Sequence, residues 1–262
     1  MHRYRQITYR LKNSIEVIKC IPAAYRKGQE RGERIRPKTK EEMKRANMQQ
    51  AARKLARKIN ANFTPGDYHL ILTYKRAPDK QTAHGNLKNF LKSLRKAYKR
   101  AGGELKYIAM TEYKGKRVHH HLVINNIQME GRTVPGTIRS LWKPHGGIQL
   151  ISLYDSGEYS ELASYLIKET EETFREEDSP FKQRYSCSRN LITPEPKVED
   201  REVKHTWRKT PKPPPGYYIK PDSLYNGFDK MGYRYQRYIL IRLNPDGENW
   251  DENWSYEEYW PD

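Results

Sequence analysis

Residues 105–126 read LKYIAMTEYKGKRVHHHLVINN, and this stretch decides the fold. Two strand-like runs, LKYIAMTEY and RVHHHLVINN, flank the short polar connection Lys114-Gly115-Lys116. Strand-forming runs joined by a tight polar turn predict an antiparallel hairpin. The other elements are placed relative to this hairpin.

Three consecutive histidines, His119, His120 and His121, lie inside the second strand of the hairpin. Because strand side chains alternate between two faces, His119 and His121 share one face and His120 points to the other. Two imidazoles about 7 Å apart on one strand can chelate a cation and leave room for a third ligand and for substrate. We therefore predict a metal site on that face; a polar strand with surface histidines is the simpler alternative.

Glu112, on the first strand of the hairpin, is the candidate third metal ligand. If the connecting loop holds an even number of residues, Glu112 pairs with an odd-numbered residue such as Arg117 or His119. Its carboxylate then shares the face of His119 and His121. A loop with an odd number of residues would place Glu112 on the opposite face.

Elements on both sides of the hairpin complete the predicted fold. YHLILTYK, from Tyr68, reads as a buried strand, and an amphipathic helix follows it. After the hairpin we expect a short helix over 135–142, a strand over 147–153 and a helix over 158–174. This order predicts an α+β fold of the ferredoxin-like or RRM-like kind. Its antiparallel sheet would carry helices on one face and leave the other face free.

The chain is predicted to divide into three consecutive parts. Residues 1–60 hold 18 Lys and Arg against five Glu, and are interpreted as a basic arm and a basic amphipathic helix. Thr39 is the expected N-cap of that helix, with Glu42 three residues on. Residues 61–176 form the catalytic domain, and residues 177–262 form a C-terminal extension.

The last twenty residues of the chain hold seven acids, several aromatic side chains and no base. Acids among flat rings resemble the charge and stacking surfaces of DNA. Our hypothesis is that this tail competes with non-specific DNA for the basic surface. Packing of the rings on the fold and contact with a partner protein are the alternatives.

The overall composition points to a nucleic-acid partner. The formal net charge is +18 and the pI is about 9.7, an excess of positive charge that favours polyanions. Cys20 and Cys187 lie far apart, so a metal is expected on His, Asp or Glu. No apolar run approaches the roughly 20 residues of a membrane span, and the N-terminus lacks the apolar run of a signal peptide. We therefore expect the protein in the cytoplasm of its host cell, without a membrane partner.

Bases on the predicted N-terminal helix and on the hairpin are the candidate DNA contacts. Phosphate contacts of this kind hold DNA in place without reading its sequence. The candidates are Arg53, Lys54, Arg57, Lys58 and Arg117.

Tyr165 is the candidate nucleophile. On a helical wheel of the last predicted helix, Tyr165 lies outside the core stripe, together with Lys168. Lys168, three residues on, would lie beside the phenol, where its charge could favour the phenolate and neutralise a phosphate. A tyrosine in a helix is most often an ordinary packing residue, so its assignment depends on Lys168.

The strand HLILTY, the run EYKGKRVHHHLVI and the helical SYLIK occur in the order found in HUH endonucleases. Within that family the chain resembles the rolling-circle replication initiators of bacterial plasmids, phages and integrative elements. The motifs cover about residues 60–175. The resemblance implies that His119 and His121 bind Mg²⁺ or Mn²⁺ and that Tyr165 attacks DNA. In one respect the chain departs from the family: His120 stands where a hydrophobic residue is usual, and we interpret it as a neutral histidine packed in the core.

The expected reaction is nicking of single-stranded DNA, or of an origin hairpin, with formation of a 5′-phosphotyrosine and a free 3′-OH. A polymerase needs this 3′-OH, so a host helicase and polymerase are further candidate partners. Conjugative relaxases place their tyrosine before the histidines, opposite to the order here. Single-tyrosine transposases share the order and remain an alternative. A non-catalytic RRM-like module that binds single strands by aromatic stacking is the other one.

Overall fold

The computed structural model describes residues 2–34, 39–114, 117–175, 183–203 and 207–243. The chain divides into two compact units. We call residues 44–193 the central unit, and residues 1–43 with 194–262 the terminal unit. The acidic tail from residue 244 onward, to which we assigned DNA mimicry, lies outside the described residues.

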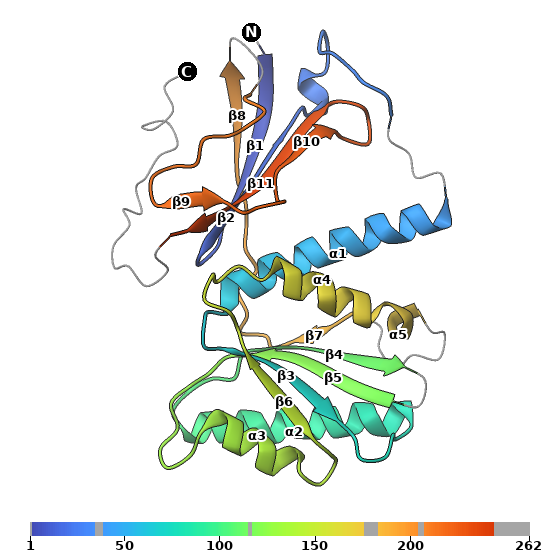
Figure 1. The fold of residues 1–262 in the computed structure, drawn as a ribbon, viewed down its shortest axis with the longest axis vertical. Coiled ribbons are helices and arrows are strands. Elements are labelled where there is room, and N and C mark those ends of the chain that lie inside the picture. Colours follow the sequence, from blue (N-terminus) through green and yellow to red (C-terminus); the bar gives the residue numbers. More distant parts are fainter. Residues whose placement is uncertain (1, 35–38, 115–116, 176–182, 204–206, 244–262) are drawn as a thin grey trace. The chain divides into compact units, whose positions relative to one another are not determined.

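The central unit is built on a five-stranded antiparallel sheet in the order β6-β3-β5-β4-β7 (Figure 1). Its strands are β3 (Tyr68–Thr73), β4 (Tyr107–Lys114), β5 (Arg117–Ile124), β6 (Ile148–Ser152) and β7 (Ser186–Cys187). The helices are α1 (Lys40–Asn62), α2 (Lys80–Arg100), α3 (Val134–Trp142), α4 (Ser160–Glu169) and α5 (Glu171–Arg175). The predicted α+β class and the order of elements from β3 to α4 are confirmed.

Two helices cover one face of this sheet, as predicted. Apolar side chains of α2 and α3 pack on the strands there, among them Leu94 and Trp142 against Leu70 and Leu122. Figure 1 shows α2 and α3 together on one side of the sheet. The resulting core supports the hairpin from below the candidate site.

The opposite face is not free, which corrects the sequence-based expectation. Helices α1 and α4 pack on it through a second apolar cluster that includes Leu55, Ile59 and Leu166 over Ile108 and Val123 (Figure 1). The apolar stripe of the predicted basic helix therefore belongs to the core of the central unit. Its bases lie on the remaining sides of α1.

The start of α1 has the predicted cap. The hydroxyl of Thr39 accepts a hydrogen bond from the backbone N–H of Glu42 at 3.1 Å. The Glu42 carboxylate accepts one from the backbone N–H of Thr39, also at 3.1 Å. This reciprocal pair satisfies two N–H groups that the helix itself leaves unbonded.

The helix expected over 158–174 is divided in two. α4 ends at Glu169, and α5 starts at Glu171. Between them the hydroxyl of Thr170 donates to the carbonyl oxygen of Leu166 at 2.7 Å. Threonine hydroxyls that bond back to the preceding turn compete with the backbone ladder, which accounts for the interruption.

The terminal unit is a second antiparallel sheet formed by both ends of the chain. Its order is β10-β11-β2-β1-β8, and β9 also pairs with β11. The strands are β1 (His2–Arg10), β2 (Ser14–Cys20), β8 (Lys197–Val203), β9 (Tyr217–Ile219), β10 (Tyr225–Phe228) and β11 (Arg234–Arg242), and a 3₁₀ turn η1 spans Ala23–Tyr25. The predicted three consecutive parts therefore differ from the structure, in which residues 2–20 are strands and not an arm.

Among the described helices, none has both the length and the apolar character required to cross a membrane.

A candidate metal centre beside a tyrosine

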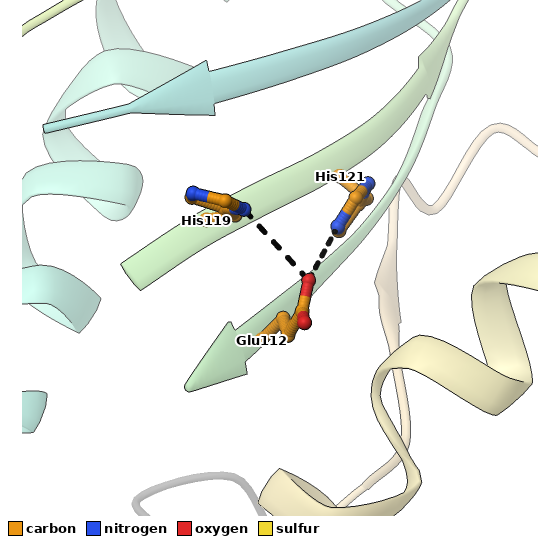
Figure 2. A group of neighbouring side chains, drawn as sticks. All are labelled: Glu112, His119 and His121. Carbon is orange, nitrogen blue, oxygen red and sulfur yellow. Dashed lines mark hydrogen bonds and ion pairs between the residues drawn. The ribbon is translucent and has the colours of Figure 1, made fainter. Parts of the chain in front are cut away.

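Glu112, His119 and His121 lie together on one face of the β4–β5 hairpin (Figure 2). Lys114 pairs with Arg117, so two residues form the loop, and this even number sets Glu112 opposite His119. The register is the one on which the prediction of a shared face depended. The alternation of strand side chains therefore brings the three groups together.

The three side chains are close enough to bind one ion. An oxygen of Glu112 lies 3.2 Å from Nε2 of His121 and 3.8 Å from Nδ1 of His119 (Figure 2). One ligand atom from each residue can be chosen so that all three lie within 4.8 Å of one another. Two imidazole nitrogens and a carboxylate oxygen are a donor set that suits divalent metals. This group could therefore hold a metal ion.

Burial of the group is uneven. Glu112 and His121 are buried, whereas the side chain of His119 is about one third exposed. Burial lowers the pKa of His121, and Glu112 only partly opposes that shift. The imidazole is therefore neutral near pH 7, which is the form that binds metals. A ligand can approach from the side of His119.

His120 lies on the opposite face, as predicted, and is fully buried. Its Nδ1 lies 2.8 Å from the hydroxyl of Thr111, and its Nε2 lies 2.9 Å from the hydroxyl of Tyr74. Burial lowers its pKa to about 3. The interpretation of His120 as a neutral histidine of the core is confirmed.

Tyr165, on α4, lies next to the metal group. The centre of its ring is 6.0 Å from that of His121 and 6.1 Å from that of His69. Its side chain is nevertheless 42% exposed, because the core of α4 is formed by the other face of the helix. The structure thus brings a partly accessible phenol to the edge of the predicted metal site.

The electrostatic surroundings of Tyr165 differ from our expectation. Burial raises the pKa of its phenol, and the carboxylates of Glu169 and Glu112 raise it further. Lys168, which we expected to favour the phenolate, is exposed and lines a cleft of about 260 Å³ that Glu112 also lines. Its position suits a phosphate contact in that cleft, a role that stays a prediction.

His69 is a neighbour of the metal group that the sequence analysis missed. It is buried on β3, and its Nε2 lies 3.4 Å from Nδ1 of His121, with the two rings stacked. In YHLILTYK, alternation places His69 on the face opposite Leu70 and Leu72, which was a usable signal. The missing information was that β3 pairs with β5, which brings His69 beside His121.

The five predicted DNA-contacting bases are placed on two elements. Arg117 is exposed at the start of β5 and shares the strand face of His119. Arg53 and Lys54 are exposed on α1, whereas Arg57 and Lys58 are partly buried there. Their contacts with DNA stay predictions.

Residues 67–170 match the model of a family of replication-associated proteins, the ORF2 family. The matched segment covers less than half of the chain, but it includes β3, the whole hairpin, Tyr165 and Lys168. The match supports a role as a replication initiator. No curated protein and no solved structure shows significant similarity to the chain.

Proposed function

We propose that this protein is an HUH-type replication initiator that nicks single-stranded DNA at an origin of rolling-circle replication. The observation that carries the proposal is the position of Tyr165, whose ring lies 6.0 Å from that of His121 in the Glu112, His119 and His121 group. The match of residues 67–170 to a replication-associated family supports it. Phosphoryl transfer requires a nucleophile beside a cation site, and these residues supply both.

In the proposed reaction, Oη of Tyr165 forms a bond to the scissile phosphorus and the P–O3′ bond breaks. The phenol loses its proton, and the departing O3′ takes one up. The products are a 5′-phosphotyrosine and a free 3′-OH. Because one phosphodiester replaces another, the strand can be rejoined later.

Glu112, His119 and His121 would hold Mg²⁺ or Mn²⁺, which supplies charge stabilisation at the scissile phosphate. Glu112 also orients His121 through their 3.2 Å contact. Lys168 and Arg117 would contact neighbouring phosphates from the two sides of the group. Single-stranded DNA is the proposed substrate.

Adduct formation tests the proposal. The purified protein is incubated with a randomised single-stranded DNA pool and Mn²⁺, and covalent adducts are separated by denaturing electrophoresis. Tyr165→Phe should abolish the adduct, while Tyr154→Phe, at an equally exposed tyrosine, should leave it unchanged. Mass spectrometry should place the nucleotide on Tyr165.

An adduct on another tyrosine would overturn the assignment of the nucleophile. Binding of the DNA pool without any adduct, in Mg²⁺ and in Mn²⁺, would favour the non-catalytic RRM-like alternative.

A further inference from the structure

A second cleft, of about 670 Å³, opens on the central unit outside the candidate metal centre. Its lining comes from the C-terminal half of α2, the start of β4 and the segment that follows β7. Glu112, His119, His121 and Tyr165 are not part of it. The lining residues that matter here are Arg95, Lys99, Tyr107, Ser188, Arg189 and Asn190.

The charge of this cleft is positive. Arg95, Lys99 and Arg189 are exposed, and none of them forms an ion pair with a described residue. The lining includes one carboxylate, that of Glu104, which accepts a hydrogen bond from the amide of Asn190 at 3.1 Å. Three cations without ion-pair partners among the described residues therefore surround a single carboxylate that is already engaged.

The wall of the cleft is held in place by the sheet. Cys187 of β7 pairs with Ile108 of β4. The backbone N–H of Tyr107 donates to the hydroxyl of Ser188, and the N–H of Ser188 donates to the carbonyl of Tyr107, both at 3.0 Å. Arg189 is consequently fixed opposite the end of α2. The cationic groups thus belong to a preformed surface, and less ordering is required on binding.

Tyr107 adds an aromatic side chain to the same wall. Its ring is partly exposed, and the guanidinium carbon of Arg95 lies 5.9 Å from the ring centre. Cationic grooves with aromatic side chains bind single-stranded nucleic acids through phosphate contacts and base stacking. The cleft volume is large enough for about one nucleotide-sized group, within the range of roughly 300–1,000 Å³ of small-ligand sites.

We infer that this cleft binds single-stranded DNA at a nucleotide outside the cleaved position, with Arg95, Lys99 and Arg189 on phosphates and Tyr107 against a base. The inference rests on the proposed function for the choice of DNA as the ligand. It adds a second contact point to the one at the metal centre. A substrate long enough to reach both should bind more tightly than a short one.

The test compares two triple variants with equal loss of charge. The cleft variant is Arg95→Gln, Lys99→Gln and Arg189→Gln. The control is Lys88→Gln, Lys92→Gln and Lys96→Gln, at exposed positions of α2 outside the lining. Affinity for a fluorescent 30-nucleotide single strand is measured as a function of salt. The cleft variant should bind roughly tenfold more weakly, and its salt slope should fall by about two, as expected for three lost contacts on a single strand. The control should change both quantities much less.

Equal effects of the two variants, in proteins with unchanged thermal unfolding, would overturn the inference. A strand carrying 5-iodouracil should photocrosslink to Tyr107, and crosslinks confined to other residues would count against it. Loss of dATP binding in the cleft variant with unchanged oligonucleotide affinity would assign the cleft to a free nucleotide instead. Since these readouts need no cleavage, a wild-type protein that binds but never nicks would refute the proposed function and leave the cleft standing.

Discussion

Nε2 of His69 lies 3.4 Å from Nδ1 of His121, on the side of the imidazole ring that faces away from Glu112. When Nε2 of His121 binds a cation, Nδ1 carries the proton and needs an acceptor. His69 supplies that acceptor from the neighbouring strand. His69 is thus a positioning residue, with no contact to the DNA required.

The contribution of His69 can be measured as metal affinity. Partners of this kind typically contribute about 10–100-fold to affinity, so His69→Ala should weaken Mn²⁺ binding by roughly that factor in calorimetry. His69→Gln keeps an acceptor and should recover part of the loss. Equal affinities for wild type and His69→Ala would exclude the positioning role.

The three predicted ligands should differ from their neighbour in the strand. His119→Ala and His121→Ala should each abolish cleavage and Mn²⁺ binding, and Glu112→Gln should weaken binding because a neutral amide replaces the carboxylate. Arg117→Gln, on the same strand face, serves as a control that should retain metal binding. Normal Mn²⁺ affinity in both histidine variants would show that the ion binds elsewhere.

His120→Ala should act on stability and not on metal affinity. The substitution leaves a cavity and removes hydrogen-bond partners from Thr111 and Tyr74. We expect a loss of about 2–4 kcal/mol in the free energy of unfolding, measured by denaturant titration. A stable variant that no longer binds metal would contradict the strand register.

Bases on α1 should contribute to DNA binding through charge alone. Removal of residues 1–58 is unsuitable as a test, because it would also remove β1, β2 and the core residue Leu55. Arg53→Gln with Lys54→Gln changes two exposed groups and should reduce the salt slope by roughly one to two. An unchanged slope would show that this face of α1 does not contact DNA.

The sequence was sufficient for the metal group because two local rules define it. Alternation separates His120 from His119 and His121, and a two-residue loop sets the register of Glu112. His69 was missed because its place depends on which strand lies beside β5. That pairing depends on the tertiary fold and is not visible in a single segment.

The terminal unit was missed for a different reason. In β1 and β2 several alternating buried positions are polar, among them Gln6, Thr8 and Lys19. Hydrophobic periodicity therefore does not reveal these strands. Similarly, the covered second face of the central sheet depends on the small apolar residues of α1, whose abundant bases led us to interpret it as a DNA-binding arm.

The pairing of β2 with β11, and of β1 with β8, makes the central unit an insertion between two halves of one sheet. A ribosome releases β1 and β2 long before the strands that pair with them. The central unit, whose contacts lie within residues 44–193, can close first, since domains generally fold as units during synthesis. Until β8 and β11 emerge, β1 and β2 present unpaired edges that other chains can join. A nascent chain stalled before residue 234 would therefore carry a folded nicking centre together with an adhesive, half-built sheet.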